Sequence, residues 1–227
     1  GKECLPSHLV LGSTLQYLSS EKYRKDEIYI LFVPTTHGPC RTGQYFVFYE
    51  NLFKDLRLET VVVFTMDSDN SYTELGPEFT KYAWWSAVIA DYMKDVETSL
   101  RTCAADPASA MQIYDRIWQK MIGVAERDIT KVLPVLKEIA DEIGRIPLAR
   151  KMEDCPKVLI VGEIYVRRDD FAVDELISQF SRHGIIGKVS NVAEWFYYCD
   201  LVRHYELKKK LSILPWHKKL FSREFRD

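Results

Sequence analysis

Residues 28–35 read Ile-Tyr-Ile-Leu-Phe-Val-Pro-Thr, and this nearly continuous apolar run decides the fold class. Such a run is typical of a strand that is buried on both faces of a parallel sheet. A second run, Glu-Thr-Val-Val-Val-Phe-Thr-Met, covers residues 59–66, and residues 41–56 between them have the spacing of an amphipathic helix. The apolar stripe of this helix consists of Tyr45, Tyr49, Leu52 and Leu56. We therefore predict a strand–helix–strand unit over residues 28–66, with a right-handed crossover.

The same alternation returns towards the other end of the chain. Residues 157–162 form a third buried apolar run, and residues 185–189 form a shorter one. Helical patterns follow at 169–183 and 192–211. We predict an α/β fold in which the first three apolar runs share one mainly parallel sheet, with helices on both faces.

The middle of the chain has helical periodicity without a strand signal. The expected helices cover residues 79–100, 108–124 and 130–144, and a short helix is expected at 7–20. We interpret the middle as a helical insertion. The chain then divides into a first α/β part (1–66), a helical insertion or layer (67–156) and a second α/β part (157–227).

Composition limits the possible partners and compartments. The 227 residues are 47% hydrophobic, carry a formal net charge of −2 and have a pI of about 6.3. This balance predicts neither a nucleic acid nor a membrane as partner, and no apolar run is long enough to span a bilayer. Five cysteines without a CxxC spacing argue against a disulfide scaffold or a zinc finger and favour a reducing cytoplasm. Because the chain lacks an initiator Met and stops in a charged run, we interpret it as a fragment of a larger protein.

Cys40 stands in the segment Thr-Thr-His-Gly-Pro-Cys-Arg-Thr-Gly-Gln-Tyr, residues 35–45. It follows the carboxyl end of a predicted strand and begins a predicted helix, where ligands bind in open parallel sheets. The helix start and Arg41 both favour a thiolate, the form that binds metal or attacks a substrate. Gly38 and Gly43 allow the backbone to approach closely. Cys40 packing under the turn is the alternative, and His37 is a conceivable base for it.

Cys4 has a similar setting. It leads into a helix that we expect to begin near Ser7, a plausible N-cap. Two cysteines at two helix starts suggest one shared site for a soft metal. We expect Cys199 to be a core residue, and Cys103 and Cys155 to lie outside this site.

Glu163 and Arg167 follow the third apolar run, in Val-Gly-Glu-Ile-Tyr-Val-Arg, residues 161–167. They stand at the expected ligand edge of the sheet, although a salt-bridged pair that fixes the loop is an equal alternative. The chain contains no GxSxG, HExxH, GxGxxG or GxxxxGK[ST] motif, so it has no recognisable ATP-binding loop of its own. No residue can be assigned as catalytic.

These motifs together resemble a known family. Gly-Lys-Glu-Cys-Leu-Pro (1–6), Gly-Pro-Cys-Arg-Thr-Gly-Gln-Tyr (38–45), Gly-Glu-Ile-Tyr-Val-Arg (162–167) and Glu194-Trp195 occur in that order. They are similar to the dehydratase-like region of the large CoA-substrate-specific enzyme activases, which is related to the 2-hydroxyacyl-CoA dehydratases. The resemblance covers residues 1–66 and 157–200, while the helical middle is only compatible with it.

The resemblance implies a flavodoxin-like fold and an iron–sulfur function. In the family, an activase ATPase drives one electron to a [4Fe-4S] cluster that reduces a bound acyl-CoA. By this resemblance Cys4 and Cys40 are cluster ligands, and the other ligands come from the rest of the polypeptide, a partner or solvent. The site-lining candidates are Arg41, Gly43, Glu163 and Arg167. The implied partners are the remaining domains of the same polypeptide or an activase ATPase, with an acyl-CoA as substrate.

Two other functions remain open from the sequence. The chain can be a cluster-free interaction or regulatory module that keeps the fold, or a thiol enzyme that uses Cys40. Whether it is itself an enzyme, acting as a component of a dehydratase-like lyase or reductase system, is left open by the residues alone.

Overall fold

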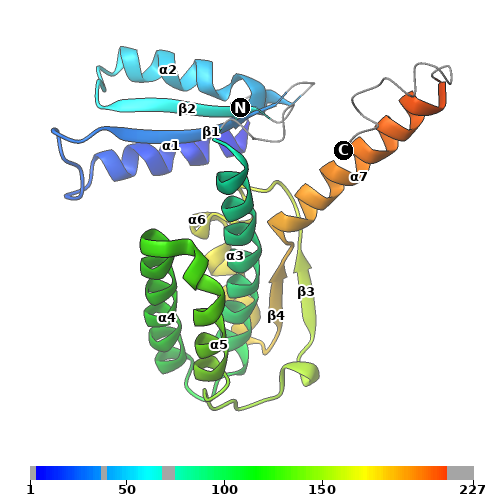
Figure 1. Ribbon diagram of the computed structural model, residues 1–227. Helices are drawn as coiled ribbons and strands as arrows, with labels where there is room; N and C mark the ends of the chain where they lie inside the picture. Colours follow the sequence, from blue (N-terminus) through cyan, green and yellow to red (C-terminus); the bar gives the residue numbers. More distant parts are fainter. Residues whose placement is uncertain (1–3, 37–39, 68–74, 214–227) are drawn as a thin grey trace.

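The structure of the protein, a computed structural model, describes residues 4–36, 40–67 and 75–213. His37 and Gly38 lie outside the described residues, as do residues 1–3 of the first motif. The fold is a mixture of α-helices and small parallel sheets, as the sequence predicted at this coarse level (Figure 1). No helix in the described ranges is long and apolar enough to cross a bilayer.

The first unit contains the predicted strand–helix–strand sequence. Its elements are α1 (Leu5–Leu18), β1 (Tyr29–Thr35), the 3-10 helix η1 (Arg41–Gln44), α2 (Tyr45–Asp55) and β2 (Val61–Asp67). Strands β1 and β2 are parallel, with Tyr29 opposite Val61 and Thr35 opposite Asp67. The pairing confirms that the two apolar runs at 28–35 and 59–66 lie side by side.

Only one face of this sheet is covered within the described chain. Helices α1 and α2 both pack on the face that carries Leu31, Val33 and Val63. On the opposite face Ile30 is 70% exposed, and Phe32 and Val62 are each 48% exposed. The expectation of a strand buried on both faces is therefore wrong for β1, because both helices lie on the same side and burial alternates along the strand.

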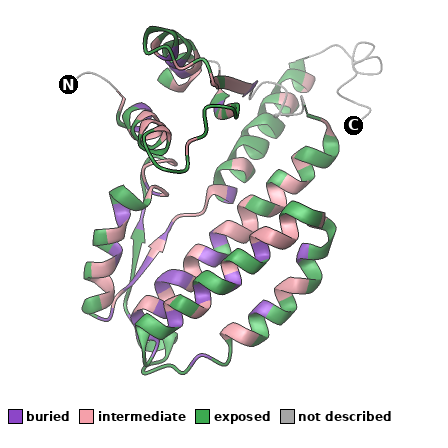
Figure 2. Ribbon diagram, turned by 90° about the vertical axis from the view of Figure 1, so that its left-hand side faces the viewer, coloured by how far each residue is buried: buried purple, intermediate pink, exposed green. Residues whose placement is uncertain are grey.

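A helical layer occupies the middle of the chain. It consists of α3 (Pro77–Cys103), α4 (Pro107–Asp128), the 3-10 helix η2 (Ile129–Lys131) and α5 (Val132–Ile143). The side chain of Asp106 accepts a hydrogen bond from the Ser109 N–H and so caps α4. The largest core cluster lies among these helices and includes Leu100, Ile117 and Ile139. Buried residues accordingly line the facing sides of these helices in Figure 2.

The second α/β unit packs against this helical layer. Its elements are the 3-10 helix η3 (Met152–Asp154), β3 (Lys157–Ile160), α6 (Asp170–Arg182), β4 (Ile186–Val189) and α7 (Val192–Ile213). Strands β3 and β4 are parallel, and β4 contacts both α6 and α3, which also contact each other. Helix α3 also contacts α4 and α7, so it joins the helical layer to the second unit. In α7 only Ala193 is buried, and the helix projects from the body of the molecule (Figure 1).

The prediction of one shared sheet is wrong. In the described residues β1 pairs with β2 and β3 pairs with β4, which gives two separate two-stranded sheets. Each pair comes from one continuous strand–helix–strand segment, so local connectivity decides the pairing. The long helices α3 and α4 separate the two segments in the sequence. Helix α3 packs against β4 of the second sheet.

Candidate functional site

Cys4 is the N-cap residue of α1, one position before Leu5. The helix begins earlier than expected, so Ser7 is not its N-cap but a buried residue of the first turn. The hydroxyl of Tyr49 donates hydrogen bonds to the carbonyl oxygen of Ser7 at 2.9 Å and to its hydroxyl at 3.0 Å. This buried contact fixes the start of α1 against α2 and so determines where Cys4 lies.

Tyr45 is the residue of α2 that reaches Cys4. Its hydroxyl donates a hydrogen bond to Cys4 Sγ over 2.8 Å. Burial raises the pKa of Tyr45 well above its ordinary value, and the contact with Cys4 raises it further, while hydrogen bonding with Thr42 lowers it. Tyr45 therefore keeps its proton and acts as a donor to the sulfur.

Cys40 lies at the start of η1 and is exposed. Its Sγ is 3.2 Å from the hydroxyl oxygen of Thr42. Hydrogen bonding with Thr42 also lowers the pKa of Tyr45, so Thr42 lies near the tyrosine that contacts Cys4. The two cysteines that the sequence singled out are thus brought to one neighbourhood, at the carboxyl end of β1.

The backbone around Cys40 differs from the single helix expected over 41–56. A 3-10 turn comes first, and the α-helix begins only at Tyr45. Gly43 is needed in this turn, because a Cβ there would lie 2.3 Å from the carbonyl oxygen of Thr36. The turn therefore rests directly on the residue that follows β1. Arg41, the first residue of the turn, is exposed.

Glu163 and Arg167 lie in the second unit, in the loop between β3 and α6. Glu163 accepts a hydrogen bond from the Val166 N–H at 2.9 Å. Arg167 is buried, and its guanidinium donates to the carbonyl oxygens of Gly162, Ser190 and Asn191. These bonds join the loop after β3 to the loop after β4. Burial lowers the pKa of Arg167, and the neighbouring Arg168 lowers it further.

This geometry favours a loop-fixing role for Arg167 over the lining of a ligand site. The pKa of Tyr49 is raised first by burial, with a smaller contribution from Tyr165 in this loop.

One important residue was missed by the sequence interpretation. Asp91, in the middle of α3, is 2% exposed and forms an ion pair with Arg168. Its carboxylate also accepts hydrogen bonds from the N–H groups of Val192 at 2.9 Å and Ala193 at 2.8 Å. It thereby caps the start of α7 from another helix. The signal in the sequence was an acidic residue within an otherwise apolar helical stripe. This pattern does not indicate which residues the carboxylate contacts.

The described side chains around Cys4 and Cys40 include the two thiols, the hydroxyls of Tyr45 and Thr42, and His8, whose Nδ1 is 3.2 Å from the carbonyl oxygen of Cys4. Among the described residues, no three His, Cys, Asp or Glu side chains lie together as a group able to hold a metal ion. Cys103 and Cys155 lie elsewhere, buried together with their sulfurs 3.6 Å apart, while Cys199 is exposed on α7 rather than in the core. Comparison with protein-family models, curated proteins and solved structures finds no match in any of the three.

Proposed function

We propose that this chain is an iron–sulfur-associated, dehydratase-like or activase-associated module that acts in ATP-driven electron transfer to an acyl-CoA. The observation that carries the proposal is the neighbourhood that Cys4 and Cys40 share around Tyr45 and Thr42. Packing of α1 against α2 brings the two cysteine segments to the same end of the sheet, where both thiols can serve one ligand. Thiolates at the carboxyl end of a parallel strand are suited to binding a soft metal.

The residues present fit one half of a [4Fe-4S] site. Cys4 and Cys40 would supply two thiolate ligands, and the Tyr45 hydroxyl would remain as a hydrogen-bond donor to the Cys4 sulfur. When bound, such a cluster supplies one-electron transfer. The remaining ligands would come from other parts of the polypeptide, from a partner or from solvent, since the described residues offer no third cysteine beside these two.

The uncovered face of the β1–β2 sheet supports the proposed partners. An apolar sheet face normally packs against another layer, and here Ile30, Phe32 and Val62 have none in the described chain. We propose that the remaining domains of the same polypeptide, or an activase ATPase, cover this face. A flavodoxin-like arrangement and a cytoplasmic location belong to the same proposal.

The thiol-enzyme alternative depends on a base beside Cys40, and His37, the candidate base, lies outside the described residues. A nucleophilic cysteine needs a base within hydrogen-bond reach. The polar neighbour of the Cys40 sulfur in the described residues is the Thr42 hydroxyl, which is not a base at neutral pH. Anaerobic reconstitution with iron and sulfide distinguishes the proposal from the alternative of a cluster-free interaction or regulatory module.

The test is anaerobic reconstitution with iron and sulfide. The proposal expects a brown protein with broad visible absorbance and bound iron in the full chain. Cys4→Ser and Cys40→Ser should each lower the bound iron, whereas Cys199→Ser, a change at an exposed cysteine outside the site, should not. A colourless, iron-free protein, or equal losses in all three variants, would count against a cluster and favour the cluster-free module.

A further inference from the structure

A hollow of about 440 Å³ lies between the end of α3, the segment before η3 and the end of α6. Its lining contains three arginines, Arg101, Arg150 and Arg182, and the two hydroxyl residues Thr102 and Ser181. No Asp or Glu side chain contributes to the lining among the described residues. The hollow is thus a concentration of positive charge in a chain whose overall net charge is −2.

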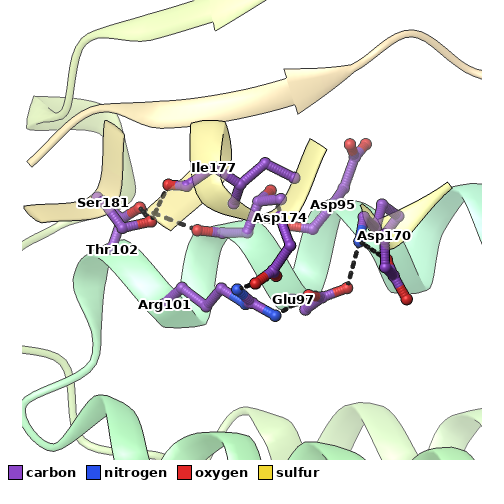
Figure 3. Close-up of polar contacts among 10 residues, drawn as sticks. Asp95, Glu97, Arg101, Thr102, Asp170, Asp174, Ile177 and Ser181 are labelled. Carbon is purple, nitrogen blue, oxygen red and sulfur yellow. Dashed lines mark hydrogen bonds and ion pairs between the residues drawn. The ribbon is translucent and has the colours of Figure 1, made fainter. Parts of the chain in front are cut away.

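Arg101 is held rigidly at one side of the hollow. Its guanidinium contacts Asp174 at 2.6 Å and Glu97 at 2.7 Å, as Figure 3 shows. These two carboxylates occupy the terminal nitrogens, while the buried Nε atom has no acceptor among the described residues. Thr102, the next residue, contacts the Ser181 hydroxyl at 3.1 Å and so fixes α3 against α6.

Arg150 and Arg182 supply charge that the described carboxylates do not neutralise at close range. Arg150 is exposed and forms no ion pair with a carboxylate in the described part of the chain. Arg182 has only a long contact, at 3.9 Å, with Glu175. Two of the three arginines therefore keep most of their hydrogen-bonding capacity, and each guanidinium presents its donors as a planar fork.

The backbone makes room for Arg150 at one particular residue. Gly184 has a φ of +72°, and a Cβ built there would lie 2.1 Å from a terminal nitrogen of Arg150. Any other residue would meet backbone strain at this φ and would displace the flexible Arg150 guanidinium from its place over the turn. The glycine that ends α6 thus also allows Arg150 to lie over the turn, at the edge of the hollow.

We propose that this hollow binds a small molecule that carries phosphate groups. Guanidinium forks match phosphate oxygens in geometry, and their charge-assisted hydrogen bonds are stronger than neutral ones. The volume is in the range of small-molecule sites. Since Arg150 and Arg182 come from two separate segments around one hollow, a ligand with more than one phosphate can contact both better than a single anion. This inference does not depend on Cys4, Cys40 or a cluster.

The test is calorimetric titration of the whole chain with inorganic pyrophosphate, and in parallel with orthophosphate and citrate. We expect saturable binding of pyrophosphate, weaker binding of orthophosphate, and little binding of citrate, which carries comparable charge on carboxylates. Arg150→Gln and Arg182→Gln should each weaken pyrophosphate binding by about tenfold, the scale of one charge-assisted hydrogen bond.

The matched control is Arg145→Gln, which removes the same charge from an exposed residue outside the lining. It should leave pyrophosphate binding unchanged. Thermal melts will show that all three variants stay folded, which is expected because the substituted side chains are exposed. The proposal is overturned if the unchanged protein shows no saturable binding, if Arg145→Gln weakens binding as much as the other two, or if citrate binds as tightly as pyrophosphate.

Discussion

The hydroxyl of Tyr45 donates a hydrogen bond to Cys4 Sγ over 2.8 Å, and this contact ties the first residue of α2 to the N-cap of α1. Tyr45→Phe removes the donor and keeps the ring. We expect the free energy of unfolding to fall by about 1 kcal/mol, the net value of a hydrogen bond in a partly buried site. Urea unfolding measures it. Tyr92→Phe, at an exposed tyrosine on α3, is the control and should change nothing measurable. Equal losses in both variants would contradict a role for the Cys4 contact.

Cys103 and Cys155 form a second, buried pair whose sulfurs are 3.6 Å apart. Treatment with an excess of a small organic disulfide should join them. The two thiols lose two electrons and two protons, which reduce the reagent to its thiols. We expect one peptide cross-link between α3 and the segment before β3, seen by mass spectrometry, and a gain in stability of about 4 kcal/mol at most. A mixed disulfide on Cys103 alone, without the cross-link, would contradict this expectation.

The same pair predicts a loss of stability at alkaline pH. Burial, followed by the contact with Cys155, raises the pKa of Cys103 from its ordinary value of 9.0 to about 11. Between these values the folded chain holds a proton that the unfolded chain has released, so stability falls as pH rises from 9 to 11. The effect of this one group is at most about 3 kcal/mol. Cys103→Ala should flatten this part of the curve of unfolding free energy against pH, and an unchanged slope would exclude Cys103 as its cause.

Asp91 should be among the most sensitive polar residues of the chain. Asp91→Asn removes the charge that faces Arg168 and weakens the cap on α7, while the size stays the same. Removing one partner of an ion pair whose carboxylate is fully buried costs about 3 kcal/mol. Asp115→Asn, the same change at an exposed residue of α4, should cost less than about 0.5 kcal/mol. Denaturant unfolding of the two variants compares them directly.

Arg167→Ala and Arg41→Ala should lower the stability of the chain by different amounts. The sequence predicted that both matter less for folding than for the site, but Arg167 is buried and donates to three carbonyl oxygens. We now expect Arg167→Ala to lose several kcal/mol, because three carbonyl acceptors lose the donor that joins the two loops. Arg41→Ala, at an exposed position, should have the smaller effect. Similar melting temperatures for the two variants would support the sequence-based expectation instead.

Local pattern was sufficient to find the elements but not to assemble them. The strands at 28–35, 59–66, 157–162 and 185–189 and the helices between them were predicted, since periodicity and turn residues are local signals. The prediction of a single sheet was wrong, because an apolar run does not indicate which distant strand it pairs with. The same run also failed to show that β1 is covered on one face only, since Ile30 and Leu31 are equally apolar.

The candidate site was predicted in part for a similar reason. Cys4 and Cys40 were selected by their positions before helices, and the structure brings them to one neighbourhood. Tyr45 was assigned to the apolar stripe of α2, which hid the role of its hydroxyl. Asp91 was passed over because its partners, Arg168 and the start of α7, lie far away in the sequence. Such contacts depend on tertiary packing, which a single sequence does not specify.

The uncovered apolar face of the β1–β2 sheet also affects how the chain can be studied. Dyes that fluoresce on apolar surfaces are often used to detect loosely packed states. Here Ile30, Phe32 and Val62 offer such a surface in the folded chain, so a bright dye signal will not indicate unfolding. The signal becomes useful in another way: a partner that covers this face will displace the dye, and the fall in fluorescence gives a direct titration of that partner without any label on the protein.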